Sequence, residues 1–134
     1  MKTTVTTLKT STQDDVLILS VQGRLSWDGM VKVGEESITV PFAFRNLIEE
    51  QVRNGVKKFV LDLTQCTYVD SSGLGTLVTS YAKVANAKGS VSLVVARESK
   101  LYDTLQAAKL FTLFDSAHDS VESALQKLRE TKSA

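Results

Sequence analysis

The sequence predicts an α/β fold, because apolar runs of strand length alternate with segments whose apolar residues recur at helical spacing. The runs at 16–21, 57–63 and 91–95 are almost continuously apolar, which is typical of strands buried on both faces of a parallel sheet. We therefore expect residues 1–134 to form a single domain. Its mixed, mostly parallel sheet would have about four or five strands flanked by about four helices.

The first part of the chain predicts two strands, an irregular segment and a helix. Residues 3–9 indicate an edge strand, and a turn at 13–15 leads into a central strand over 16–21. The segment 25–41 is atypical in length and composition, and its alternating apolar residues between 31 and 40 suggest an added hairpin. Pro41 suits the first turn of a helix, which we expect to end at Asn54 and Gly55.

The second part of the chain continues the alternation of strands and helices. We expect strands over 57–63, 91–95 and 111–114, and helices over about 71–87, 98–108 and 120–128. Ser120 would cap the last helix.

The junction between the 57–63 strand and the next helix carries the most informative residues. They are Asp70, Ser71, Ser72, Gly73, Leu74 and Gly75. The first three lie at or just before a helix N-terminus, where free N–H groups and the helix dipole favour an anionic group, including a phosphate on a serine oxygen. Asp and Ser are also preferred capping residues, so composition alone favours a helix cap over a modification site.

Composition limits the classes of partner and compartment. The chain has 134 residues, 43% of them hydrophobic, and can form a core without disulfides or metal. Its net charge of +1 gives no reason to expect nucleic acid or an anionic membrane as partner. The single cysteine, Cys66, has no disulfide partner and no metal-binding neighbours, so we expect a structural role. Without a secretory signal or an apolar run of about 18 residues, we expect a cytoplasmic protein with no membrane insertion.

The sequence contains parts of enzyme motifs, but each motif lacks a residue that it requires. Gly73 and Gly75 begin like a dinucleotide fingerprint, but Val78 stands where the third glycine belongs. A serine hydrolase would need a histidine base, and we expect the only histidine, His118, to lie in a solvated loop. We therefore expect no enzyme activity, and a hydrolase using Ser71 or Ser72 stays a remote alternative.

The motif and its surroundings resemble a known family. Asp70-Ser-Ser-Gly-Leu-Gly75, preceded by the strand Val60-Leu-Asp-Leu63, is similar to the signature of the STAS domain family, particularly of bacterial anti-sigma-factor antagonists (anti-anti-sigma factors). The strand at 16–21 with Gly23, the strand at 88–95 and the segment 105–114 also resemble elements of that family. The resemblance covers roughly residues 3–24 and 43–128, and the hexapeptide is its specific part.

The resemblance implies a partner-switching regulatory protein. Ser71 occupies the position that an anti-sigma factor or related switch kinase phosphorylates, and the unphosphorylated antagonist binds that partner and frees what it sequesters. Asp70, Ser72, Gly73, Leu74 and Gly75 would surround the switch site. The partner would supply the catalysis and the nucleotide, so the resemblance implies no cofactor for this chain. A serine/threonine phosphatase would reset the switch.

Two departures from the family pattern concern the segment after the 16–21 strand. Many members have an acidic residue directly after the Gly-x-Leu of that strand, whereas this chain has Arg24, Leu25 and Ser26, with Asp28 two residues later. We expect Ser26, Trp27 and Asp28 to include partner contacts, and the long 25–41 segment to carry specificity. Two interpretations are open for Trp27: it is an apolar plug against the sheet, or it is an exposed contact for a partner. We favour the plug.

A non-phosphorylated STAS module is the competing hypothesis. Such a module would be a subunit of a lipid-transport or signalling assembly, or a small-ligand sensor, and would use the same surface for constitutive docking. The discriminating feature is whether Ser71 is an accessible acceptor or a cap whose hydroxyl is occupied by the helix backbone.

Overall fold

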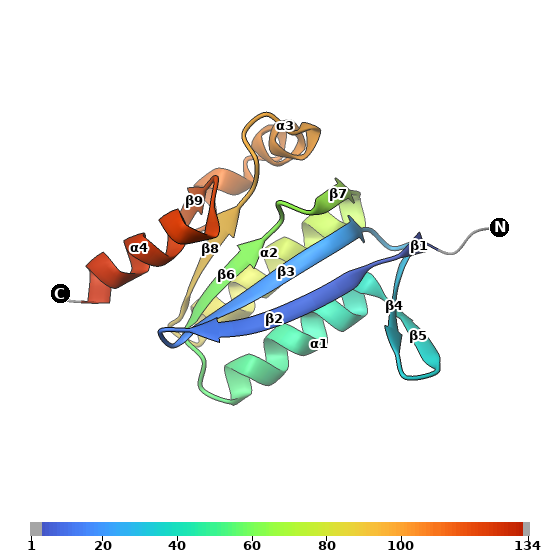
Figure 1. The fold of residues 1–134 in the computed structure, drawn as a ribbon, viewed down its shortest axis with the longest axis horizontal. Coiled ribbons are helices and arrows are strands. Elements are labelled where there is room, and N and C mark those ends of the chain that lie inside the picture. Colours follow the sequence, from blue (N-terminus) through green and yellow to red (C-terminus); the bar gives the residue numbers. More distant parts are fainter. Residues whose placement is uncertain (1–3, 133–134) are drawn as a thin grey trace.

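The computed structural model describes residues 4–132, and its main sheet has the strand order β2-β3-β6-β8-β9 (Figure 1). These strands are Thr7–Gln13 (β2), Val16–Leu25 (β3), Lys58–Asp62 (β6), Ser90–Val94 (β8) and Ser116–His118 (β9), and a short strand, Cys66–Val69 (β7), pairs with the end of β3. β2 and β3 form an antiparallel hairpin, whereas the β3–β6, β6–β8, β8–β9 and β3–β7 pairs are parallel. The mixed, mostly parallel sheet expected from the sequence is confirmed.

Four α-helices within the described residues cover the two faces of this sheet. They are Val40–Arg53 (α1), Ser71–Asn86 (α2), Lys100–Ala107 (α3) and Val121–Lys132 (α4). α2 passes behind β3 and β6 in Figure 1. The expected helices are confirmed, with boundaries that differ by a few residues, and the side chains of Ser99 and Ser120 cap α3 and α4 through the backbone N–H groups of Tyr102 and Ser123.

The alternation of side chains along β3 produces two cores, one on each face of the sheet. Leu17 and Leu19 belong to the larger core, which includes buried residues of α1, α2 and α3, whereas Val16 and Ile18 join the smaller core beneath α4. The larger core contains Phe44 and Ile48 from α1, Phe59 and Leu61 from β6, Leu77 and Val84 from α2, and Leu101 and Leu105 from α3. β3 is therefore buried on both faces, as its continuous apolar run predicted.

The atypical 25–41 segment contains the hairpin that its alternating pattern suggested. Gly29–Val33 (β4) and Glu36–Thr39 (β5) pair antiparallel, and Thr4–Val5 (β1) adds a parallel strand to β4, so a small second sheet forms. The hairpin protrudes beyond the end of the main sheet at the right of Figure 1. The expected edge strand over 3–9 is thus divided between the two sheets, and its first residue, Thr3, lies outside the described residues.

One strand expected from the sequence is wrong, and one strand of the structure was not expected. The 111–114 segment is not a strand, because Leu110–Thr112 forms a 3₁₀ turn and Leu110 and Phe114 both point into the larger core. The last strand is β9, three residues long, and it begins only after this turn. β7 was not expected at all, although its Thr67, Tyr68 and Val69 have high strand propensity.

Candidate functional site

Asp70 organises the start of α2 by accepting two backbone hydrogen bonds. Its Oδ1 accepts the N–H of Gly73 at 2.8 Å, which makes Asp70 the N-cap, and its Oδ2 accepts the N–H of Trp27 at 3.1 Å. The same carboxylate therefore satisfies one free donor of the helix and holds the loop after β3 against it. The carboxylate lies beside Ser71, the first residue of the helix.

Ser71 is exposed at the first position of α2, and its side chain does not cap the helix. Within the part of the chain that the structure describes, no hydrogen bond occupies its hydroxyl group. Asp70 caps the helix and neither serine does, so the Ser71 oxygen is left accessible to a second molecule. Ser72 differs from Ser71, because it is half-buried and its carbonyl accepts the hydroxyl of Thr76 at 2.9 Å.

Gly73 and Gly75 have opposite environments, although both belong to the motif. A Cβ atom at Gly73 would lie 2.0 Å from the carbonyl oxygen of Leu25 and 2.9 Å from a methyl group of Val69. The lack of a side chain therefore lets the first turn of α2 pack directly on the backbone at the end of β3. A Cβ atom at Gly75 would meet nothing within 4 Å, and between the two glycines Leu74 packs against the larger core.

The loop after β3 presents an exposed tryptophan next to the start of α2. Trp27 is 69% exposed, so the expected plug against the sheet is wrong. Its backbone N–H is held by Asp70, and the turn closes through the hydrogen bond from the N–H of Gly29 to the carbonyl of Ser26 at 3.1 Å. The tryptophan side chain is thereby presented to solvent.

Ser26 and Asp28 have different roles in this loop. Ser26 is completely buried and donates its hydroxyl hydrogen bond to Asp28, so its side chain is not available to a partner, contrary to expectation. Asp28 is exposed and also forms an ion pair with Arg24 at 3.7 Å. The hydrogen bond from Ser26, followed by the charge of Arg24, holds the pKa of Asp28 below its ordinary value. The carboxylate therefore stays ionised at neutral pH.

Arg24 and Tyr68 were missed from the sequence because their contact depends on the β3–β7 pairing. The two residues are partners in this parallel pair, and the Arg24 guanidinium lies over the Tyr68 ring at 4.3 Å from its centroid. Tyr68 is 45% exposed, so it adds a second aromatic side chain to the surface near the end of β3. A strand prediction at Thr67, Tyr68 and Val69 would have been the signal for it.

His118 and Cys66 do not assemble a nucleophilic site with Ser71. His118 ends β9, half-buried, and its two ring nitrogens are within hydrogen-bonding distance of Ser116 and Ser123, so it is not the solvated loop histidine expected from sequence. Cys66 is buried, as expected, and burial raises the pKa of its thiol. No group of three or more metal-ligating side chains gathers among residues 4–132.

A helix must be both long and apolar to cross a bilayer. None of the helices in the described region combines enough length with enough apolar character to do so.

The STAS domain family model matches residues 37–124, and the chain belongs to the STAS domain family. The matched region contains α1, β6, β7, α2 and β8, and therefore the whole Asp70 to Gly75 motif. It begins within β5, after most of the atypical segment.

Several solved structures share the fold at low sequence identity. A Thermotoga maritima protein assigned as an anti-sigma factor antagonist has a TM-score of 0.76 at 20% identity, with 91% of this chain and 94% of that chain covered. An anti-sigma factor antagonist from Mycobacterium paratuberculosis gives a TM-score of 0.71 at 21% identity, with 92% and 94% covered. The anti-sigma factor antagonist SpoIIAA in its unphosphorylated form gives 0.66 at 16% identity, with 92% and 98% covered. These similarities establish a SpoIIAA-like α/β fold, and these three neighbours are described as anti-sigma factor antagonists.

Proposed function

We propose that this protein is an anti-sigma-factor antagonist that works by partner switching, with Ser71 as its phosphorylated residue. The observation that carries the proposal is the accessible Ser71 hydroxyl at the first position of α2, beside a helix cap supplied by Asp70. SpoIIAA, which has the same fold, has been solved in both unphosphorylated and phosphorylated forms. Because Ser71 does not cap its helix, phosphorylation would leave the capping hydrogen bond in place.

The effect of phosphorylation would be electrostatic and local. A phosphoserine carries about −1.5 to −2 charges at pH 7, and the free N–H groups of the first turn of α2 favour an anion there. The fold therefore accommodates the modified serine. A partner surface shaped around a neutral hydroxyl does not, because the new charge lies beside the fixed carboxylate of Asp70. The unphosphorylated form is then the binding form, and phosphorylation releases the partner.

The exposed residues around Ser71 suggest how the partner is contacted. Trp27 lies in the loop that Asp70 holds, and Gly75 is one helical turn from Ser71 with open space over it. Trp27 and Asp28 would supply an aromatic and a charged contact from the loop. A Cβ-free position such as Gly75 lets a partner approach the backbone of α2 closely.

The partner would be an anti-sigma factor and serine kinase of the switch-kinase type, acting in the cytoplasm. It would hold ATP and Mg²⁺ and perform the phosphoryl transfer, whereas this chain supplies only the acceptor hydroxyl and is not an enzyme. The transfer forms the bond from the Ser71 oxygen to the γ-phosphorus and breaks the bond to the departing ADP, and the hydroxyl proton passes to a base on the kinase. A serine/threonine phosphatase would hydrolyse the phosphoserine and restore the binding form.

Two variants of Ser71 test the switch with a purified partner kinase. Ser71→Ala should bind the kinase constitutively, and Ser71→Asp should bind at least roughly tenfold more weakly in isothermal titration calorimetry, because a charge buried in the interface lacks a partner. Ala82→Asp is the matched control, since it adds the same charge to an exposed position about three turns later on α2. Equal affinity of Ser71→Ala and Ser71→Asp for the kinase would overturn the switch mechanism.

The phosphorylation assay separates this function from a constitutive docking module. With ATP and the kinase, the wild-type protein and Ser72→Ala should become phosphorylated, and Ser71→Ala should not. A partner that binds all three proteins equally and transfers no phosphate to any of them would favour the non-phosphorylated module.

A further inference from the structure

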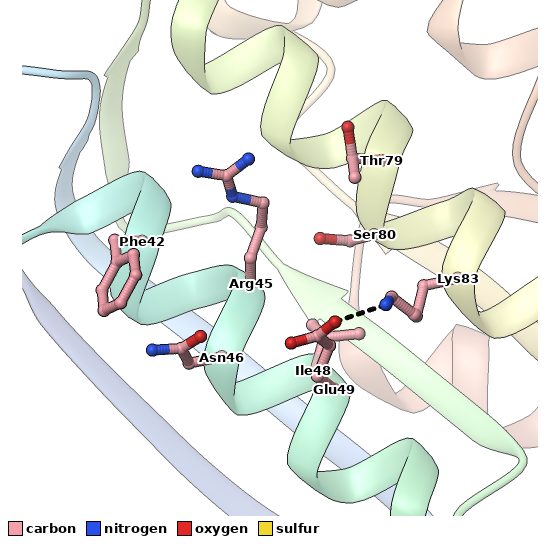
Figure 2. A pocket seen from close by; sticks show the side chains of 8 residues that line it. All are labelled: Phe42, Arg45, Asn46, Ile48, Glu49, Thr79, Ser80 and Lys83. Atoms are coloured by element: carbon pink, nitrogen blue, oxygen red, sulfur yellow. Dashed lines mark hydrogen bonds and ion pairs between the residues drawn. The ribbon is translucent and has the colours of Figure 1, made fainter.

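A cavity of about 250 Å³ lies between α1 and α2, away from the Ser71 site (Figure 2). Phe42, Arg45 and Glu49 line it from α1, and Thr79, Ser80 and Lys83 line it from α2. Ligand cavities usually measure about 300–1,000 Å³, so this one suits a small molecule. Figure 2 shows Arg45 extending from α1 across the gap, with the Ser80 hydroxyl pointing toward α1.

Ser80 gives this cavity a polar group without a partner. The residue is only 3% exposed, and its side-chain oxygen makes no hydrogen bond to any residue that the structure describes. A buried hydroxyl left unpaired destabilises the folded state, so a hydrogen bond from Ser80 to a bound molecule would be favourable. In a helix, serine commonly bonds to the carbonyl four residues earlier, but Ser80 makes no such bond.

Arg45 adds a second positive charge to the cavity, which contains Lys83 and the single carboxylate of Glu49. Its Nε donates to the carbonyl of Pro41 at 3.4 Å, which steadies the guanidinium, and its terminal nitrogens make no hydrogen bond to another described residue. Lys83, in contrast, forms an ion pair with Glu49. The hydrogen bond from Lys83 is the main reason why the pKa of Glu49 lies below its ordinary value, so this pair stays ionised and its charges cancel. The cavity therefore carries one net positive charge.

The remaining walls are partly apolar and select the kind of anion. Phe42 is 51% exposed, and Ile48 also lines the cavity. A guanidinium binds a carboxylate with well-defined geometry, and an apolar body would cover the Phe42 ring. We propose that the cavity between α1 and α2 binds a small carboxylate with an apolar body, its charge on Arg45 and its second hydrogen bond from Ser80. This proposal does not depend on phosphorylation of Ser71.

Benzoate is a suitable probe because it combines a carboxylate with an apolar ring of the right size. In a ¹H–¹⁵N NMR titration of the full chain, it should shift the amides of Arg45, Thr79 and Ser80 saturably, with a dissociation constant of about 1 mM. Benzamide, which has the same shape without the charge, should bind at least roughly tenfold more weakly, because a charge-assisted hydrogen bond is lost. Inorganic phosphate should also bind more weakly, because it has no apolar body.

Substitutions on the two helices test the assigned contacts. Arg45→Gln should weaken benzoate binding by roughly tenfold or more, while Arg53→Gln, on the same helix but outside the cavity, should leave it unchanged. Ser80→Ala should weaken benzoate binding by roughly threefold or more without lowering the unfolding temperature, since an unpaired hydroxyl is removed. Thermal unfolding of each variant checks that it is folded.

Three results would overturn the proposal. The first is the absence of saturable shifts at these amides with benzoate. The second is equal benzoate affinity of Arg45→Gln and the wild type. The third is phosphate binding as tightly as benzoate, which would overturn the assignment to a carboxylate with an apolar body.

Discussion

The two glycines of the motif provide a sharp test of how α2 is positioned. Gly73→Ala would place a Cβ atom 2.0 Å from the Leu25 carbonyl oxygen and 3.0 Å from its carbon. Both atoms belong to the backbone of β3, so a side-chain rotation cannot relieve the contact. The start of α2 would have to move by about 1 Å, because packed atoms of this kind need a little over 3 Å. Gly75→Ala would meet nothing within 4 Å.

The structure predicts that the two substitutions change the free energy of unfolding in opposite directions. Alanine is favoured over glycine in a helix by about 0.8–1 kcal/mol, so Gly75→Ala should raise the free energy of unfolding by up to about that amount. Gly73→Ala gains the same propensity but suffers an overpacking penalty of typically 1–3 kcal/mol or more, and the movement also strains the 2.8 Å hydrogen bond from Gly73 to Asp70. We expect a net loss of about 2 kcal/mol, and a difference between the variants of about 3 kcal/mol.

Urea unfolding followed by circular dichroism measures this difference directly. Both variants replace the same residue type in the same helix, two positions apart, so unfolded-state effects nearly cancel. The m-values should be equal, and only the midpoints should differ. Stabilities of Gly73→Ala and Gly75→Ala within about 0.5 kcal/mol of each other would refute the close packing of α2 on the end of β3.

Three further predictions concern the other polar and titratable groups. Asp70→Ala should lower the free energy of unfolding by about 1–2 kcal/mol, measured by urea unfolding, because it removes the helix cap and the bond to Trp27; a neutral effect would contradict the capping role. Cys66 should react with iodoacetamide far more slowly in the folded protein than in urea at neutral pH, because burial raises the pKa of the thiol, and equal rates would contradict its burial. Burial lowers the pKa of His118, so the unfolded chain takes up a proton first as pH falls. The stability contributed by neutral His118 should be complete above about pH 6.5 and decline below it. In His118→Gln, the urea unfolding midpoint should therefore fall less between about pH 7 and 5 than in the wild type. An equally steep fall in both proteins would contradict this.

The core of the site could be predicted from sequence because it depends on local chemistry. The apolar β6 strand, the acidic cap and the helical spacing that follows lie within one short stretch, and together they place Ser71 at the start of α2. The alternation of apolar residues also predicted the hairpin of β4 and β5. Local patterns such as these need no knowledge of distant contacts.

The surroundings of the site depend on contacts between distant residues, and sequence could not predict them. Trp27 faces solvent because its backbone is bound by Asp70, 43 residues later, and the same turn buries Ser26. The wrong prediction of a strand at 111–114 has a similar cause. Its apolar residues match a strand in composition, but Leu110 and Phe114 reach the core through a 3₁₀ turn that follows Lys109 in the left-handed conformation.

Phosphorylation of Ser71 can be detected by intact-mass spectrometry with peptide mapping. The protein would be isolated from its native host under several growth and stress conditions. A fraction of the protein should carry one phosphate, mapped to Ser71. A phosphate confined to Ser72, or an unmodified Ser71 under every condition, would rule out the proposed switch at Ser71 and favour a constitutive docking module.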